Sequence, residues 1–359
     1  MVASKKQRIW HRSNEKSDHF DGLPDDIIIC ILRKLCSTAS CPSDFISVLL
    51  TCKRLNTLGF HPLVLRKANP KSFAVRVRNW SESAHRFLKE CAKSGNSEAC
   101  YTLGMIEFYC LRNRRSGISL LAKAAIKSHA RALYSLAVIQ FNGSGGTKDD
   151  KNLRAGVILC AQAAGLGHFT ALRELGHCLQ DGYGASQNIA EGRRLLIQAN
   201  TLEAMSQLGS MALPRVLLHQ LSTSSSTSLV LNIVSSQEID VANRFLVEWY
   251  GLRDDELGPE GLRMCSNARC GRPETRRHEF RRCSICGIRF YCSRGCQALD
   301  WKLKHKGECN PSWDLFFAEN GVAHVEDGPV EQWFHAVDEG NDDVESTQDE
   351  DGVNTFIAI

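Results

Sequence analysis

The stretch KSHARALYSLA, residues 127–137, returns as LGHFTALRELG at 166–176. Weaker copies stand at 94–104, SGNSEACYTLG, and at 199–209, ANTLEAMSQLG. Each copy has a small alanine, then a leucine followed by glycine or alanine, and successive copies start 33, 39 and 33 residues apart. A period of this length is typical of stacked helix pairs, which bury their apolar faces only against their neighbours. The repeats therefore predict an α-helical solenoid over residues 85–212.

Glycine-bearing turns separate the first helix of a predicted pair from the second. They are NGSGGTKDD at 142–150 and DGYGASQN at 181–188. The NGSGG run does not predict a phosphate loop, because no Gly-Lys-Ser/Thr follows it and no strand pattern accompanies it. His129 and His168 take the same place in two copies, and we expect both to be structural residues at a helix turn. The pattern is similar to Sel-like repeats, which are related to the tetratricopeptide repeat.

Downstream of the repeats, potential metal ligands stand in four close pairs, separated by 4, 12, 2, 5, 3, 8 and 3 residues. They are Cys265, Cys270, Cys283, Cys286, Cys292, Cys296, His305 and Cys309. Zn²⁺ takes four nitrogen or sulfur ligands in a tetrahedron, and a short gap lets one turn of backbone place two of them together. The segment therefore predicts two structural zinc ions. Because no ligand position is left open, it does not predict zinc catalysis.

Many cations surround these ligands. Thiolates around a metal leave a net negative charge, which Lys306 and the surrounding arginines would offset. The surplus of arginines would also favour an acidic partner; these arginines are Arg276, Arg277, Arg281, Arg282 and Arg289. His278 stands alone among arginines and is not expected to be a ligand. With few apolar residues nearby, each metal is expected to supply about 10 kcal/mol of folding free energy.

The whole of 265–309 resembles a MYND-type zinc finger, including Tyr291 before Cys292 and Trp301 ahead of His305. The gap after Cys265 is wider than the two residues common in that family. Spacing alone allows sequential or crossed pairing of the ligands. The resemblance implies a cross-braced fold, with Cys265, Cys270, Cys292 and Cys296 on one zinc and Cys283, Cys286, His305 and Cys309 on the other. Fingers of this family bind short peptides of partner proteins, often proline-containing, and generally not DNA.

Near the start of the chain, DGLPDDIIICILRKL at 21–35 predicts a helix. Pro24 suits the first helical position, and the acidic residues after it complement the positive end of the helix. Apolar residues then recur on one face; they are Ile28, Ile31, Leu32 and Leu35. A linker with Pro42 follows, and DFISVLLTCKRLNTLGF at 44–60 predicts a second apolar helix.

The motifs LPDD at 23–26 and LTCKRL at 50–55 together resemble an F-box over residues 20–66. Leu55 stands where many members have tryptophan, and the segment 36–44 is longer than usual. The resemblance implies a small helical cluster that binds a Skp-type adaptor and, through it, a cullin. The residues implied in adaptor binding are Leu23, Pro24, Ile28, Leu32, Cys52 and Leu55. A helical hairpin packed on the next domain is the structural alternative.

Composition limits the class of protein. The chain of 359 residues is long enough for two or three domains, and it has no apolar run of about 18 residues, so we expect neither secretion nor a membrane span. Intracellular thiols stay reduced, so the cysteines predict metal ligands rather than disulfides. The nine cysteines outside the finger are expected to be buried or half-buried hydrophobes: Cys30, Cys36, Cys41, Cys52, Cys91, Cys100, Cys110, Cys160 and Cys178.

Charge is divided unevenly along the chain. Residues 310–359 hold thirteen Asp or Glu and no Lys or Arg, so this tail carries −13 and residues 1–309 carry +17 of the overall +4. We expect the acidic tail and the basic residues 1–19 to be largely disordered. Residues 221–260 are expected to form a serine-rich link and then a helix, QEIDVANRFLVEWYGL at 237–252, which is either a last solenoid helix or a strut.

An F-box, helical repeats and a finger in this order resemble plant F-box proteins with a C-terminal MYND finger. The resemblance implies a mostly α protein that acts as the substrate-recognition adaptor of an SCF-type ubiquitin ligase, holding an unknown client by its repeats or finger. No catalysis, nucleic acid or membrane is expected. The alternative is a scaffold or transcriptional corepressor. A lysine methyltransferase is disfavoured because repeats fill the space between 66 and 264. SKKQR at 4–8 leaves both nucleus and cytoplasm open.

Overall fold

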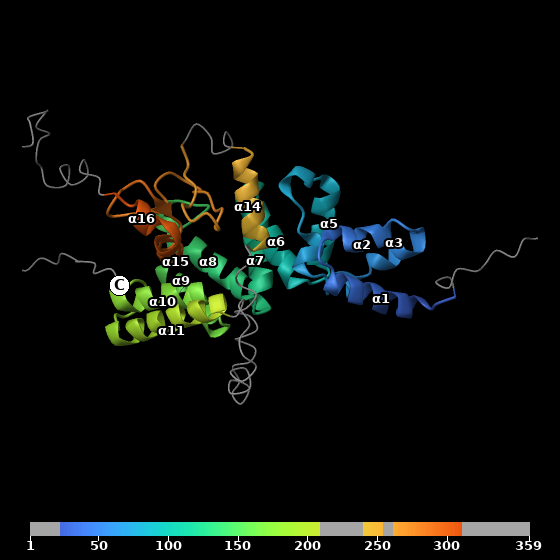
Figure 1. Cartoon of the computed structure of the whole chain (residues 1–359), viewed down its shortest axis with the longest axis horizontal. Coiled ribbons are helices and arrows are strands. Elements are labelled where there is room, and N and C mark those ends of the chain that lie inside the picture. Colours follow the sequence, from blue (N-terminus) through green and yellow to red (C-terminus); the bar gives the residue numbers. More distant parts are fainter. Residues whose placement is uncertain (1–21, 209–239, 254–260, 311–359) are drawn as a thin grey trace, which may run out of the picture. The chain divides into compact units, whose positions relative to one another are not determined.

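The computed structural model describes residues 22–208, 240–253 and 261–310 (Figure 1). All belong to one compact unit, Met1–Pro311. The predicted basic N-terminus, serine-rich link and acidic tail lie outside the described residues. The chain is mostly α, as predicted, and the strands among the described residues form one two-stranded sheet. Within the same ranges, no helix combines the length and apolarity needed to cross a bilayer.

The N-terminal cluster consists of four helices: α1 (Asp25–Thr38), α2 (Pro42–Leu49), α3 (Lys53–Gly59) and α4 (Pro62–Leu65). Its core is apolar and includes Ile28, Leu32, Phe45 and Val64, each no more than 1% exposed. Two short 3₁₀ turns, η1 (Pro70–Phe73) and η2 (Val77–Asn79), lead to the repeats.

The predicted single helix over 44–60 is wrong, because the chain breaks between α2 and α3. Cys52 has an extended backbone, with φ −154° and ψ 161°, and its sulfur accepts a hydrogen bond from the Leu55 amide at 3.5 Å. A residue that caps a new helix cannot continue the old one. Two smaller differences concern prolines: Pro42 starts α2 instead of lying in a linker, and Pro24 is the cap residue before α1.

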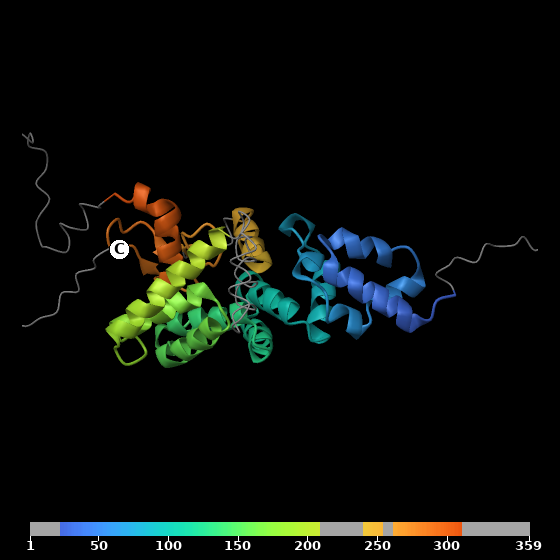
Figure 2. The same cartoon turned by 60° about the horizontal axis from the view of Figure 1, so that its bottom comes forward.

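The repeats form a stack of helices in chain order. They are α5 (Glu82–Lys93), α6 (Ser97–Met105), α7 (Arg114–Ile126), α8 (Ala130–Asn142), α9 (Leu153–Gly165), α10 (Phe169–Asp181) and α11 (Ile189–Leu208). A π-helical turn, η3 (Ile106–Cys110), extends α6, and a 3₁₀ turn, η4 (Lys148–Asp150), precedes α9. Consecutive helices contact each other along the stack, as expected of a solenoid (Figure 2).

The same local device begins α6, α8 and α10. A residue with positive φ comes first: Gly95 at 87°, Ser128 at 57° or Gly167 at 85°. The next residue then caps the helix by accepting the amide hydrogen of a fully buried alanine. The three caps are Asn96 at 3.0 Å, and His129 and His168 through Nδ1 at 3.1 Å each. The two histidines therefore have the structural role predicted for them.

The fourth sequence copy, 199–209, does not start a new helix, contrary to the prediction. Helix α11 runs without a break from Ile189 to Leu208. At the places of the left-handed residue and the cap, this copy has Asn200 and Thr201. Thr201 donates to the Ile197 carbonyl at 3.0 Å, and the amide oxygen of Asn200 accepts from Arg173 at 3.0 Å instead of capping a helix.

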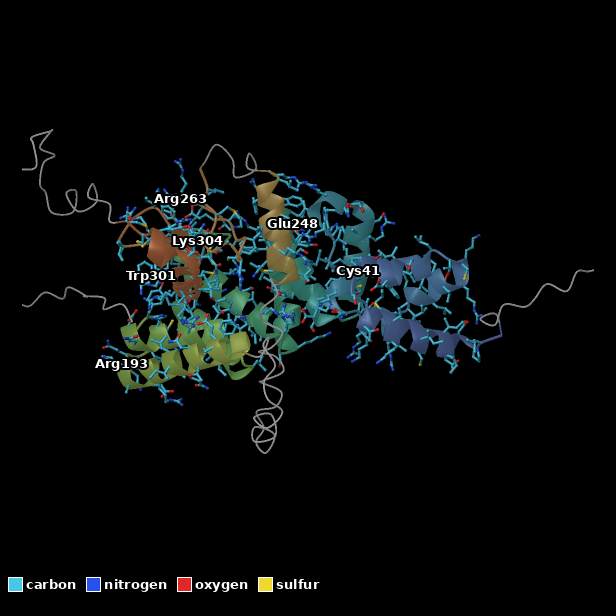
Figure 3. All side chains as sticks on the ribbon, viewed as in Figure 1. Cys41, Arg193, Glu248, Arg263, Trp301 and Lys304 are labelled. Atoms are coloured by element: carbon cyan, nitrogen blue, oxygen red, sulfur yellow. The ribbon has the colours of Figure 1, made fainter. Side chains whose placement is uncertain are left out.

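After the undescribed segment, α14 (Val241–Gly251) packs on α6, η3 and η2, so it is a strut rather than a further solenoid helix (Figure 1). The Tyr250 hydroxyl donates to the Tyr109 carbonyl at 2.5 Å. The carboxylate of Glu248 pairs with Arg76 and accepts from the Val77 amide at 3.2 Å (Figure 3). These contacts link α14 to the first repeat and to the end of the N-terminal cluster.

The C-terminal finger has little regular structure. Strands β1 (Arg281–Arg282) and β2 (Phe290–Tyr291) pair antiparallel, with Arg281 opposite Tyr291 and Arg282 opposite Phe290. Three short helical segments follow: α15 (Arg294–Asp300), the π-helical η7 (Trp301–His305) and α16 (Lys306–Glu308). Gly271 and Gly287, each directly after a ligand cysteine, have φ of 69° and 66°, which lets the chain turn back sharply there.

The cysteines outside the finger divide by location. Six are buried as predicted: Cys36, Cys91, Cys100, Cys110, Cys160 and Cys178. Cys41 is half-buried. Cys30 and Cys52 are exposed, so the prediction was wrong for these two. Cys30 lies on the solvent side of α1, and Cys52 uses its sulfur as a helix cap.

Candidate metal centres

Four cysteines from two separate parts of the finger meet at one point. The sulfurs of Cys265, Cys270, Cys292 and Cys296 lie within 4.8 Å of one another, and all four residues are buried. The Cys270 and Cys292 sulfurs are 3.6 Å apart, as are those of Cys292 and Cys296. Hydrogen bonds from the neighbouring thiols hold the pKa of Cys270 well below its usual value, which favours a thiolate. We call this group the four-cysteine centre.

A second group joins the turn before β2 to the C-terminal helical segments. The Nε2 atom of His305 lies 3.4 Å from the Cys283 sulfur and 3.5 Å from that of Cys286, and the Cys283 and Cys309 sulfurs are 4.0 Å apart. Burial lowers the pKa of His305, which favours the neutral imidazole that a metal ligand requires. We call this group the histidine-containing centre. The eight residues thus have the crossed grouping that the resemblance implied.

The donor atoms fit tetrahedral zinc. Four sulfurs at roughly 2.3 Å from a metal would be about 3.8 Å apart, and a histidine nitrogen at roughly 2.0 Å would lie about 3.5 Å from each sulfur. The sulfur pairs above are 3.6 to 4.0 Å apart, and the nitrogen–sulfur pairs 3.4 to 3.5 Å. Thiolate and imidazole are donors that suit Zn²⁺. Both clusters are therefore compatible with zinc.

Residues around the ligands fix their positions. The Tyr291 hydroxyl donates to the Asp300 carboxylate at 2.8 Å, which ties β2 to the end of α15, and Tyr291 is fully buried. The Ser293 hydroxyl accepts from the Cys296 amide at 3.1 Å and so caps α15. Because α15 carries Cys296, this cap also orients a ligand.

Of the lysine and arginines expected to offset the thiolate charge, Arg272 contacts a ligand sulfur directly. Lys306 is exposed, whereas the Arg272 guanidinium is 4% exposed and donates through Nη1 to the Cys270 sulfur at 3.4 Å. Its Nη2 donates to the Ser135 hydroxyl of α8 at 2.9 Å. Burial opposes the charged form, but the negative charges of Cys270 and Cys292 raise the pKa of Arg272 well above its usual value.

Arg276 and Arg289, both expected to attract an acidic partner, have partners within the described chain. Arg276 donates to the carbonyls of Asn142, at 2.5 Å, and Gly143, at 2.9 Å, and thereby holds the finger on the repeats. Arg289 pairs with Glu308 at 2.9 Å. Arg277, Arg281 and Arg282 are exposed. Sequence reasoning missed the bridging role of Arg276, because its partners lie more than 100 positions away.

At the other end of the described chain, the LPDD and LTCKRL motifs come together. The Arg54 guanidinium donates to the Leu23 carbonyl at 2.5 Å and pairs with Asp25 at 2.7 Å. Leu23 and Leu55 are half-buried at this end, and Pro24 and Cys52 are exposed. Four of the six residues implied in adaptor binding therefore reach the surface.

The remaining two lie elsewhere. Ile28 and Leu32 are each 1% exposed and form part of the core, so in this fold they have no surface for a partner. The exposed apolar residues of α1 are Ile27 and Ile31, each 44% exposed and one turn apart. The run of isoleucines makes both faces of α1 apolar, and the periodic pattern placed Ile31 on the same face as Ile28 and Leu32, whereas Ile31 is exposed.

Two family models match parts of the chain. Residues 70–174 match plant tetratrico peptide repeats, and residues 265–309 match the MYND finger. Among curated relatives, the chain is 60% identical over 316 residues to F-box protein At5g50450 of Arabidopsis thaliana, covering 88% of this chain and 92% of the relative. It is 53% identical over 356 residues to F-box protein At1g67340 of the same plant, covering 96% and 89%.

Two solved structures are also similar. A Sel1 repeat protein from Oxalobacter formigenes has 16% identity and a TM-score of 0.35, covering 51% of this chain and 74% of that one. The protective antigen c5321 of uropathogenic Escherichia coli, which has an SLR fold, has 15% identity and a TM-score of 0.39, covering 65% and 47%.

Proposed function

Because the chain belongs to the family of the Arabidopsis F-box proteins At5g50450 and At1g67340, we propose that it is the substrate-recognition adaptor of an SCF-type cullin ubiquitin ligase. The N-terminal cluster binds a Skp-type adaptor and thereby a cullin. The rest of the chain holds a client protein. The chain does no chemistry of its own: it raises the effective concentration of client lysines near the ubiquitin-loaded enzyme.

One observation carries this proposal: six large apolar side chains of the N-terminal cluster lie on its surface. They are Ile27, Ile31, Ile46, Leu50, Phe60 and Leu63, with exposed fractions from 39% to 76%. Exposed apolar surface of this kind marks protein interaction sites. Ile27 and Ile31 follow Leu23 and Pro24 on the same helix end, so we propose them as adaptor contacts in place of Ile28 and Leu32.

The other side of the cluster is fixed to the repeats. The amide nitrogen of Asn96 donates to the carbonyls of Leu65, at 3.0 Å, and Ala68, at 2.8 Å, and Asn96 is 4% exposed. The same residue caps α6. A rigid join of this kind favours a constant separation between the ligase machinery and the client.

We also propose that each cluster of the finger binds one Zn²⁺, held by the residues of the four-cysteine and histidine-containing centres. When bound, the metal supplies folding free energy and no catalysis, because all four positions of each tetrahedron are taken by side chains. The experiment for this part is elemental analysis of purified full-length chain, with two zinc ions per chain expected.

The adaptor role is tested by binding of the full-length chain to a purified Skp-type adaptor. Ile31→Asp should weaken binding at least tenfold, because a charge would be buried in an apolar interface. Ile126→Asp is the matched control: Ile126 is 84% exposed on α7, away from the cluster, and its substitution should leave binding unchanged. A folded chain that does not bind the adaptor would instead favour a ubiquitin-independent scaffold or corepressor role.

A further inference from the structure

The finger covers one face of the solenoid. We define the first-helix face as the surface made by α8, α10 and the loop 142–145. The Tyr134 hydroxyl pairs with Ser293 at 2.9 Å, and the Asn142 amide donates to the Cys292 carbonyl at 2.8 Å. The Gly295 amide donates to the buried Glu174 carboxylate at 2.8 Å. Figures 1 and 2 both show α15 beside α10.

This interface has no space for a longer side chain at its closest points. A Cβ atom on Gly295 would lie 2.5 Å from the Thr170 methyl group and 3.0 Å from the Tyr134 hydroxyl. A Cβ atom on Gly271 would lie 2.6 Å from the Val247 backbone nitrogen on α14. The finger is therefore packed as closely on the repeats and α14 as the parts of one core are packed on each other.

Arg272 lies inside this interface. It donates to Ser135 on α8 and to Cys270 in the four-cysteine centre, and the rings of Tyr101 and Tyr109 lie near it. Arg272 is 4% exposed, so water does not replace a hydrogen bond that it loses. One of its acceptors is a ligand of the four-cysteine centre and the other lies on α8. The same side chain therefore joins a metal ligand to the repeats.

We propose that Arg272 couples metal occupancy of the four-cysteine centre to docking of the finger on the first-helix face. The inference rests on the metal content proposed above, and not on adaptor binding. A bound metal would fix the Cys270 sulfur in the position where Arg272 donates to it. Without the metal the four sulfurs are free to separate, and the buried Arg272 guanidinium loses one of its hydrogen-bond partners. Release of the finger from the repeats returns Arg272 to water and relieves this cost.

A consequence follows for the client. Stacked helical repeats commonly bind partners along an extended face. In this chain, the metal-loaded finger occupies the first-helix face, including Tyr134, Ser135 and Glu174. A client must therefore be held elsewhere while metal is bound, and metal loss opens a surface that the loaded chain conceals.

The test is hydrogen exchange of the full-length chain, followed by mass spectrometry of peptides covering 130–146 and 169–181. Zinc is quantified in the same samples. In the wild type, removal of zinc by a chelator should speed exchange in both segments at least tenfold. Arg272→Gln should speed hydrogen exchange in both segments of the zinc-loaded chain by a similar factor, or it should lower the chelator concentration that removes zinc. Either result is expected because docking and metal binding affect each other equally. Arg272→Lys, which keeps the charge, should lie in between.

Arg269→Gln is the matched control, because Arg269 adjoins Cys270 but is exposed, and it should behave as wild type. Unchanged exchange after complete zinc removal, or equal effects of Arg272→Gln and Arg269→Gln, would overturn the proposal. If the purified chain contains no zinc and withstands the chelator unchanged, the metal assignment itself fails, and the zinc measurement identifies that case separately.

Discussion

Arg54 at the start of α3 and Asp25 at the start of α1 form an ion pair of 2.7 Å, although 29 positions separate them. Arg54 also donates to the Leu23 carbonyl. These bonds hold the LPDD and LTCKRL motifs side by side, which places half-buried Leu23 and Leu55 and exposed Pro24 at one end of the cluster. The pair therefore positions the residues that we propose for adaptor binding.

Arg54→Ala should reduce adaptor binding more than it reduces stability. The Asp25 and Arg54 side chains are 61% and 35% exposed, and a surface ion pair contributes only about 0.2–1 kcal/mol to folding. The loss of orientation at Leu23 should still weaken adaptor binding several-fold. Thermal unfolding and biolayer interferometry measure the two effects. A large fall in melting temperature with unchanged affinity would contradict this role.

Two substitutions on α1 should have opposite effects. Leu32→Ala removes a 1% exposed core side chain and should cost about 2–5 kcal/mol of unfolding free energy. Ile31→Ala removes a 44% exposed side chain, so stability should change little while adaptor affinity falls. Chemical denaturation and binding assays on both variants check the division. Equal losses of stability would show that the two faces of α1 are assigned incorrectly.

Gly271→Ala should destabilise the contact between the finger and α14. Its φ of 69° disfavours alanine, and the new Cβ atom would lie 2.6 Å from backbone on α14. We expect a cost of about 2 kcal/mol or more, as for other strained core substitutions. Gly307→Ala serves as control, because a Cβ atom at Gly307 would have nothing within 4 Å and the φ of this residue is not positive. Differential scanning calorimetry of both proteins should show a lower melting temperature for Gly271→Ala alone.

Acid should destabilise the solenoid through His168. Burial lowers its pKa to about 3, and the charges of Arg131 and Arg272 and the neighbouring His129 act in the same direction. The unfolded chain takes up this proton near pH 6.5, whereas the folded chain does not until about pH 3. This contribution to stability is therefore complete above pH 6.5 and is lost as the pH falls toward 3.

His168→Asn removes the titrating group and keeps a side chain that can cap α10. The variant should lose less stability than wild type between pH 6.5 and 4, measured by chemical denaturation with zinc in excess so that metal release is the same in both. If the unfolding free energies of the two proteins fall equally between pH 6.5 and 4, His168 is not the cause of the acid destabilisation.

Local chemistry explains which features the sequence predicted. The repeats could be predicted because each true helix start needs a left-handed residue, a cap and a small alanine within a few positions. The fourth copy also has residues suited to these roles, Asn200 and Thr201 with a small alanine after them, so this local criterion could not have excluded a helix start there. The crossed ligand grouping needed the family resemblance, because short gaps specify close pairs but not which pairs share a metal.

The remaining features depend on contacts between distant positions. Ser135 and Arg272 are 137 positions apart, and Glu174 and Gly295 are 121 apart. Neither contact is accompanied by a periodic pattern or a fixed spacing from which it could be predicted in a single sequence. The orientation of α1 was ambiguous for a different reason. Isoleucines lie on both of its faces, so the hydrophobic periodicity does not show which face is buried. Tertiary packing alone distinguishes Ile28, in the core, from Ile27, at the surface.

The most direct test of the account is native mass spectrometry of the full-length chain mixed with a purified Skp-type adaptor. We predict a one-to-one complex whose chain carries two zinc ions, one for each cluster of ligands. A chain that stays free of the adaptor, or that carries no zinc in either state, would contradict it.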